Sequence, residues 1–176
     1  TAKNDGTNSS IQTSGDGAHG IYALSLGGGG GTGSNVFNFS SDISLSKENT
    51  STEFEGKFTL GGSGGTGGQG ENVTVTNNGL IATEGKEAHG IIAQSIGGGG
   101  GSGGMAIAGD VQLGLAKPDS DTDPSSMRLS IGGKGGTGNQ GGEVIVTNTE
   151  SGTIRVSGDN SYGVFAQSIG GGGGNG

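Results

Sequence analysis

Two histidines and a tyrosine stand at equivalent positions of a motif that occurs three times. The motif covers 18–31, 88–101 and 161–174, and the three residues are His19, His89 and Tyr162. Stacked imidazoles can ligate a metal ion. Because the third copy has tyrosine, we predict a column of flat polar rings with a structural role, and no metal site.

A second candidate for chemistry is the acidic run 119–123, in which Asp alternates with Ser and Thr. An EF-hand loop that begins at Asp119 requires Gly at its sixth position and Glu at its twelfth. The chain has Pro124 and Ser130 there. We therefore expect a solvated acidic loop, with a loose calcium site as the alternative.

The calcium-binding repeat Gly-Gly-x-Gly-x-Asp has two near matches, at 64–69 and 135–140. Both place a glutamine, Gln69 or Gln140, where the repeat requires the aspartate that supplies its charge. The sequence therefore predicts no calcium at these positions.

Glycoside-cleaving chemistry on a β-helix needs paired carboxylates. No Asp or Glu pair recurs on adjacent predicted strands, and the two histidines have the structural role given above. We expect no catalytic, cofactor-binding or metal-ligating residues, and hence no enzyme. Thr74, Thr76 and Thr147 form too irregular a row for ice binding, because Ile145 interrupts it, but they leave weak glycan binding open.

Composition limits the core that the chain can build. Glycine accounts for 46 of 176 residues, hydrophobic residues for 27% and aromatic residues for 4%. Such a chain has to remain disordered or to bury thin apolar strips between stacked units. The absence of cysteine excludes a disulfide scaffold.

Charge and hydropathy exclude further classes of partner. The formal net charge is −8, and the eight basic residues do not cluster, so no surface is basic enough to bind nucleic acid. No apolar run approaches the roughly 18–20 residues of a membrane helix. We expect no direct membrane insertion by this segment.

The glycine runs that end the three motifs begin at Gly27, Gly97 and Gly170, at spacings of 70 and 73 residues. Near-constant spacing is the signature of a repeat architecture. We interpret 1–176 as one repeat array and as a fragment of a longer protein. Its units are a partial one at 1–31 and full ones at 32–101 and 102–176.

Each unit divides into three or four short predicted strands separated by glycine. Residues 73–76 and 144–147 alternate β-branched side chains, 80–83 continue after a turn, and 90–96 precede the glycine run. No segment has a useful 3.6-residue apolar period. The sequence therefore predicts an all-β fold, a parallel β-helix or solenoid of about 70-residue repeats.

The strand at 90–96 also predicts which side faces the core. Ala93 and Ser95 have identical equivalents in all three copies, whereas the opposite side varies in size and polarity. We expect Ile91, Ala93 and Ser95 to point inward, where space is limiting. The last residue of the strand, Leu26 or Ile96, is expected to turn inward at a corner.

The five-glycine runs have two interpretations. One is a flexible corner, which loses entropy when it is ordered. The other is a stack of runs from successive units, with close backbones that hydrogen-bond as in polyglycine. Identical run length in all copies favours the ordered stack. Collagen is excluded, because the chain has two prolines and no period of glycine at every third position.

The segments 32–57 and 102–128 are least alike between units. Residues 36–39, 42–46 and 110–115 alternate like strands, whereas 47–55 and 118–126 are polar and predict loops. Variable loops on a regular scaffold commonly bind partners. We therefore expect contact loops within 36–57 and 105–128.

Three segments carry a family resemblance: the motif at 89–101, the residues 73–85 that precede it, and the Gly-Gly-Ser-Gly-Gly-Thr-Gly-Gly stretch at 61–68. They resemble the glycine-rich repeats of large Gram-negative autotransporter passengers of the surface-adhesin type. The resemblance implies a right-handed parallel β-helix and a parent protein linked to an outer-membrane β-barrel. It also implies adhesion, aggregation or biofilm formation, and no catalytic residues.

These observations together predict a non-enzymatic structural and interaction segment at the bacterial cell surface or outer membrane, or secreted. The expected partners are a second copy of the chain or a host or matrix surface, either protein or glycan, and not nucleic acid. One alternative is a carbohydrate-active β-solenoid enzyme, which requires two carboxylates about 5–10 Å apart in a cleft. The other is a stalk that spaces a distal domain from the outer membrane.

Overall fold

The computed structural model describes residues 1–6, 8–42, 55–112 and 126–176, which form strands, turns and extended segments and no helix. The chain winds as a parallel β-solenoid, in which each strand pairs with its equivalent about one repeat later. We call each winding a coil: 1–70, 71–141 and 142–176. The strands are β1 (Ala2–Asn4), β2 (Ser10–Thr13), β3 (Ile21–Leu26), β4 (Val36–Asp42), β5 (Glu55–Leu60), β6 (Val73–Asn77), β7 (Leu80–Thr83), β8 (Ile91–Ile96), β9 (Ala106–Gln112), β10 (Ser126–Ile131), β11 (Val144–Asn148), β12 (Thr153–Val156) and β13 (Val164–Ile169).

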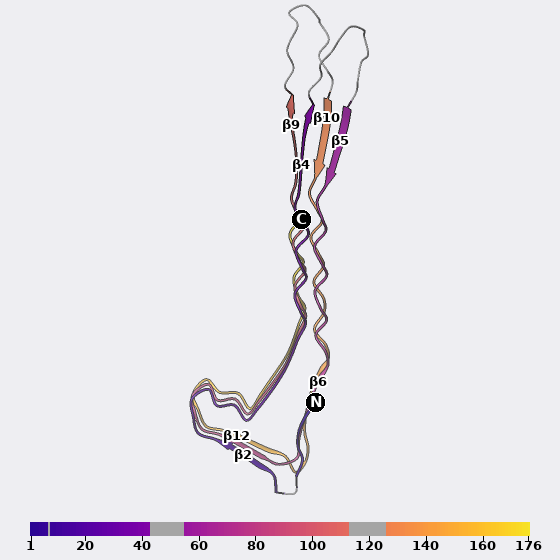
Figure 1. The fold of residues 1–176 in the computed structure, drawn as a ribbon. Coiled ribbons are helices and arrows are strands. Elements are labelled where there is room, and N and C mark those ends of the chain that lie inside the picture. The colour runs from indigo at the N-terminus through magenta and orange to yellow at the C-terminus, as the bar shows by residue number, and fades with distance from the viewer. Residues whose placement is uncertain (7, 43–54, 113–125) are drawn as a thin grey trace, which may run out of the picture.

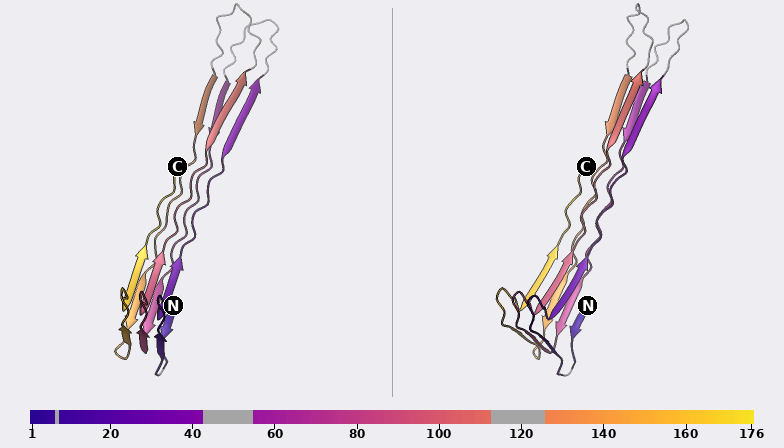
Figure 2. Two further views of the ribbon diagram at one scale, coloured as in Figure 1. Left: turned by 90° about the vertical axis from the view of Figure 1, so that its left-hand side faces the viewer. Right: turned by 60° about the vertical axis from the view of Figure 1, so that its left-hand side comes forward.

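Three parts follow one another along each coil (Figure 1). The head consists of three parallel sheets, β1-β6-β11, β2-β7-β12 and β3-β8-β13. The tip consists of the pairs β4-β9 and β5-β10. Between them lies the arm, made of two layers: 27–35, 97–105 and 170–176 in one, 61–70 and 132–141 in the other. Figure 2 shows that β3, β8 and β13 and the strands of the tip run along one long axis, and Figure 1 shows that β2 and β12 run across it.

A complete coil therefore contains five strands, and our prediction of three or four was wrong. The missed pair is β5 and β10, which pair in parallel through six residues, from Glu55 with Ser126 to Leu60 with Ile131. These strands lead directly into glycine-rich chain, so their short apolar alternation was not recognised. Glu55 and Ser126, expected at the ends of loops, are the first residues of these strands.

The register agrees with the repeat spacing of the sequence. Ile91 lies between Ile21 and Val164, at offsets of 70 and 73 residues. β6 and β11 pair at an offset of 71, and β7 and β12 at 73. The two added residues are accommodated in the turn between β11 and β12, because a solenoid tolerates length changes at turns between its strands.

The core is a thin strip inside the head, as a chain with little apolar residue content requires. Val73, Val75, Ile81, Ile91 and Ala93 are at most 5% exposed. Ser95 is fully buried as well, so the predicted inward set Ile91, Ala93 and Ser95 is confirmed.

The expected inward turn at the end of this strand is wrong. Leu26 is 64% exposed, and Ile96 is not buried. The chain has no corner there, because it continues from β3 and β8 directly into the arm (Figure 1).

The glycine runs are ordered, as the stacking interpretation predicted. Between successive coils, Gly27, Gly30 and Gly33 donate backbone hydrogen bonds to Ile96, Gly99 and Ser102 at 2.7 Å. Between the two layers, Gly62, Gly65 and Gly68 donate to Ser34, Gly31 and Gly28 at 2.6–3.0 Å. Both series advance by three residues, which is the repeat of a polyproline II helix.

This three-residue period explains why the arm needs glycine. A Cβ at Gly98 or Gly101 would overlap the carbonyl oxygen of Gly28 or Gly31, and one at Gly100 would overlap that of Gly136. We call 97–99 and 100–102 triplets of the arm. The third position of each triplet points outward, and a Cβ at Gly99 meets only Gly172 O, at 3.6 Å. The arm is therefore a Gly-Gly-X structure, in which only X can carry a side chain.

One turn of the head contains a residue in an unfavourable backbone conformation. Gly17, Glu87 and Asn160 occupy equivalent positions with φ of 68°, 55° and 54°. Gly and Asn adopt this left-handed region readily, whereas Glu does so at a cost. We expect Glu87→Asn to raise the free energy of unfolding by about 0.5–1 kcal/mol, measured by urea denaturation. Lys86→Asn, at the preceding position, is the control and should not stabilise; an equal gain in both variants would contradict the backbone explanation.

Candidate functional site

The rings of the predicted column stack along the solenoid axis. His19 and His89 have ring centroids 5.1 Å apart and are nearly parallel, at 2°. Tyr162 continues the column 5.2 Å from His89, at 28°. The column lies beside the outward rings of β3 and β13, since Tyr22 is 5.9 Å from His19 and Phe165 is 6.3 Å from His89.

Hydrogen bonds define the chemical state of the two imidazoles. The backbone N–H of His89 donates to His19 Nδ1 at 3.2 Å, and that of Tyr162 donates to His89 Nδ1 at 2.9 Å. An Nδ1 that accepts a hydrogen bond carries no proton, so the proton of the neutral ring is on Nε2. Each histidine thus ties its own coil to the next one, which is a structural task.

A matched pair of variants separates the two contributions of His89. His89→Phe keeps the ring stack and removes the acceptor of the Tyr162 N–H, whereas His89→Asn keeps an acceptor and removes the ring. Because the site is half-buried, we expect each to lower the free energy of unfolding by about 1 kcal/mol, read from urea midpoints. Wild-type stability in both variants would show that the column contributes nothing.

The other predicted metal candidates give no site within the described residues. Gln69 and Gln140 are exposed on the arm. The acidic run 119–123 lies outside the described residues, so its loop and calcium alternatives stay predictions. Within the ranges that the structure describes, no three His, Cys, Asp or Glu side chains gather as metal ligands would.

A shallow polar notch lies along one edge of the head. It forms because the turn between β6 and β7 has two residues, while the equivalent turns of the first and third coils are longer. Its lining is Asp5, Gly6, Asn8, Asn78, Thr149, Glu150 and Ser151.

The notch contains two carboxylates, Asp5 and Glu150, which bears on the carbohydrate-active alternative. They belong to the first and third coils, so the sheet spacing separates their backbones by about 10 Å. Both residues are exposed. The notch is an open polar surface that can hydrogen-bond a ligand.

The described parts of the predicted contact segments 36–57 and 105–128 lie at the tip, and most of them are strand. β4 and β9 pair from Val36 with Ala106 to Asp42 with Gln112. The central parts, 43–54 and 113–125, are outside the described residues. The expected strands at 42–46 and 110–115 are therefore described only up to Asp42 and Gln112.

The tip places apolar side chains outward, which the sequence pattern did not reveal. Thr59 is buried at 3% exposure, whereas its neighbours Phe58 and Leu60 are 60% and 56% exposed. Leu129 and Ile131 extend this apolar row into the next coil at 49% and 43%. Exposed apolar rows of this kind mark surfaces that contact other molecules.

Comparison with known proteins found no match: no family model, no curated protein and no solved structure is similar to the chain. Among the described residues there is also no helix that is long and apolar enough to cross a membrane.

Proposed function

We propose that this chain is a non-enzymatic structural and interaction segment of a surface-displayed autotransporter passenger in a Gram-negative bacterium, acting in adhesion or cell aggregation. The chain holds the tip away from the head and presents it to a partner. The partner is a second copy of the chain or a host or matrix surface.

The observation that carries this proposal is the arm. Its layers are joined by backbone hydrogen bonds in two directions, and most of its inward positions have no side chain. Nine residues with a rise of about 3.1 Å give it a length of roughly 30 Å. A scaffold built this way is a spacer of fixed length, and the least similar parts of the repeats stand at its far end.

Surface display tests the proposal. Cells or beads that carry the chain should aggregate, or adhere to matrix proteins or glycans, and bare cells or beads should not. Replacement of 43–54 and 113–125 by Gly-Ser segments of equal length should reduce adhesion at least tenfold if the predicted contact loops bind the partner. Circular dichroism confirms that the variant is folded.

Two other outcomes would decide against this function. Adhesion that is absent in the wild-type chain would overturn the proposal. A stalk is the better description if a passenger containing this chain adheres equally well before and after the replacement.

A further inference from the structure

Charged residues are missing from one continuous part of every coil. The segments 17–41, 88–109 and 160–176 contain no Asp, Glu, Lys or Arg, although 14% of the chain is charged. In the structure these segments are consecutive along each coil: β3, β8 or β13, then one layer of the arm, then β4 or β9. Their outward side forms the left-hand surface of the molecule in Figure 1. We name the outward surface of 21–38, 91–108 and 164–176 the charge-free face.

The charge-free face exposes apolar side chains from the head to the tip. On the head, Tyr22, Leu24 and Leu26 of the first coil are 56%, 42% and 64% exposed, whereas Ile92, the equivalent of Tyr22 in the second coil, is 7% exposed. At the end of the arm and on the tip, Met105 and Phe37 are 58% and 59% exposed. Aromatic residues and methionine are enriched, and charged residues depleted, in the centre of protein interfaces.

The middle of this face is bare backbone. Gly29, Gly99 and Gly172 occupy the outward X position of their triplets, where a side chain would fit without overlap. The equivalent outward positions of the other layer carry Ser63, Lys134 and other polar side chains. Glycine here leaves the surface flat, so that another backbone can approach closely.

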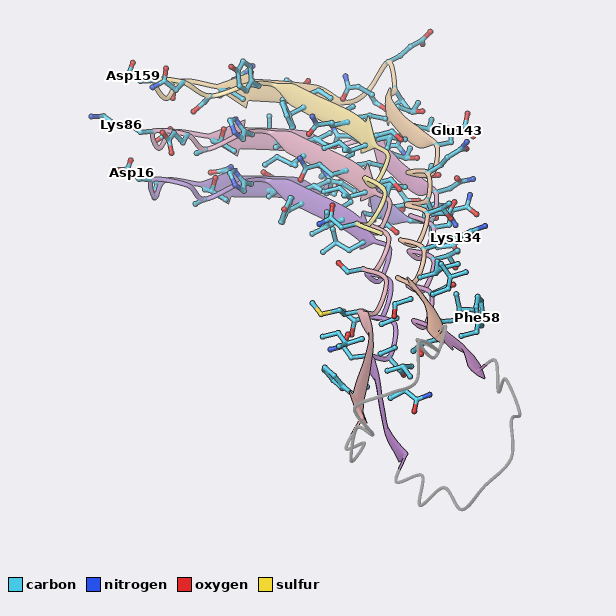
Figure 3. The ribbon with its side chains drawn as sticks, turned by 90° about the horizontal axis from the view of Figure 1, so that it is seen from above. Asp16, Phe58, Lys86, Lys134, Glu143 and Asp159 are labelled. Carbon is cyan, nitrogen blue, oxygen red and sulfur yellow. The ribbon has the colours of Figure 1, made fainter. Side chains whose placement is uncertain are left out.

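Charged residues that the structure describes lie on other surfaces of the molecule. Figure 3 shows Lys134 and Glu143 on the side opposite the charge-free face, together with Phe58. Asp16, Lys86 and Asp159 lie one above another at the turn that borders the head. Two chains of net charge −8 repel when these charged surfaces meet, whereas contact through the charge-free faces leaves these carboxylates in water.

The size of the face is sufficient for a dimer. With a rise of about 3.2 Å per residue and about 4.8 Å between coils, its area is roughly 750 Å². A standard stable interface buries about 800 Å² of each partner.

We propose that the charge-free face is the surface through which two copies of this chain associate, each contributing the same face to a symmetric contact. This inference rests on the proposed function in one respect, because it identifies the self-association surface of an aggregating protein. It places the contact between two copies along the side of the solenoid and leaves the tip to a host or matrix surface.

Charge insertion at matched arm positions tests the proposal by sedimentation velocity of the whole chain over a concentration series. Gly99→Lys adds one charge to the face of each copy without a steric overlap, and should weaken dimerisation at least tenfold. Ser63→Lys is the control, because it places the same side chain at an outward X position of the opposite layer, where the next coil already has Lys134. It should leave the dimerisation constant unchanged.

A second pair changes apolar side chains of the head. Leu26→Lys changes an exposed leucine of the charge-free face, and Ile145→Lys changes an exposed outward residue of β11, which lies outside that face. Only Leu26→Lys should impair association. Circular dichroism melts of all four variants establish that they are folded.

The contrary results are distinct from a failure of the proposed function. A wild-type chain that remains monomeric at high concentration overturns this inference, as does association that resists both Gly99→Lys and Leu26→Lys, which would indicate contact through coil ends or the opposite side. If cells or beads nevertheless adhere, the proposed function stands and only the assigned surface is wrong.

Discussion

Substitution of Gly98 by alanine is expected to destabilise the arm severely, although the change adds one methyl group. The new Cβ would overlap Gly28 O and lie 2.9 Å from Gly27 O, and both are backbone atoms that cannot rotate away. Relief of the overlap requires the first and second coils to separate. That separation breaks the bonds from Gly98 N–H to Gly68 O and from Gly30 N–H to Gly99 O, which join these two coils. We expect a loss of about 3 kcal/mol from overpacking and about 1 kcal/mol for each hydrogen bond.

Gly99→Ala is the control for this prediction, one residue further along the same run. Its Cβ has ordinary contact only, with Gly172 O at 3.6 Å. The free energy of unfolding should be unchanged or should rise by about 0.5 kcal/mol, because alanine restricts the unfolded chain. If the run were a flexible linker, Gly98→Ala and Gly99→Ala would change the free energy of unfolding equally.

Urea denaturation and amide hydrogen exchange together give the measurement. A solenoid unfolds in neighbouring units, so a local opening need not appear in the global midpoint. Exchange of the arm glycines should accelerate strongly in Gly98→Ala and remain slow in Gly99→Ala. Equal exchange rates in the two variants would contradict the three-residue arrangement.

The regular part of the fold was predictable because it repeats. Parallel strands at equal spacing pair in register, and the three copies of β3, β8 and β13 gave that register directly. The inward position of Ser95 was predictable from its small size in every copy. Its partners were not: Ser95 Oγ donates to Glu71 O and accepts from Gly142 N–H, and the latter bond crosses between coils.

The order of the arm was predictable from the sequence, but its three-residue period was not. Equal run lengths indicated order. The period is hidden in the five-glycine runs, because glycine also occupies the outward X position at Gly29 and Gly99. The second layer shows the period openly, since Ser63, Thr66 and Gln69 are spaced by three with Gly-Gly between them. Our prediction that the chain has no three-residue glycine period is therefore wrong for the arm.

The interaction surfaces were the least predictable part. Apolar alternation around Phe58 and Leu60 is normally assigned to a core, yet the structure places these side chains outside and Thr59 inside. The sequence contains the charge-free segments, but only the winding of the coils places them on one face. The charge-free face exists only when three segments distant in the sequence stack, so the order of residues along the chain does not show it.

Asn77 lies at the centre of a buried amide ladder whose disruption should have the second largest effect. Asn4 Nδ2 donates to Asn77 Oδ1 and Asn77 Nδ2 donates to Asn148 Oδ1, both at 2.8 Å. Asn77 is fully buried and Asn4 is 7% exposed, whereas Asn148 is exposed and can hydrogen-bond water. We expect Asn77→Leu, of similar volume, to lower the free energy of unfolding by about 2 kcal/mol, because the buried Asn4 amide loses its acceptor.

Asn77→Asp should make the contribution of this ladder to the free energy of unfolding depend on pH. A buried carboxylate accepts from Asn4 but has no proton to donate to Asn148, and its charge is desolvated. The protonated acid restores both functions, with one oxygen that accepts and one O–H that donates. The deficit against wild type should therefore be large at neutral pH and shrink as the pH falls toward about 4. Asn78→Asp, the neighbouring and less buried position, should show no such recovery in parallel urea titrations. A deficit in Asn77→Asp that is independent of pH would mean that the ladder is not what holds the three coils together at this edge.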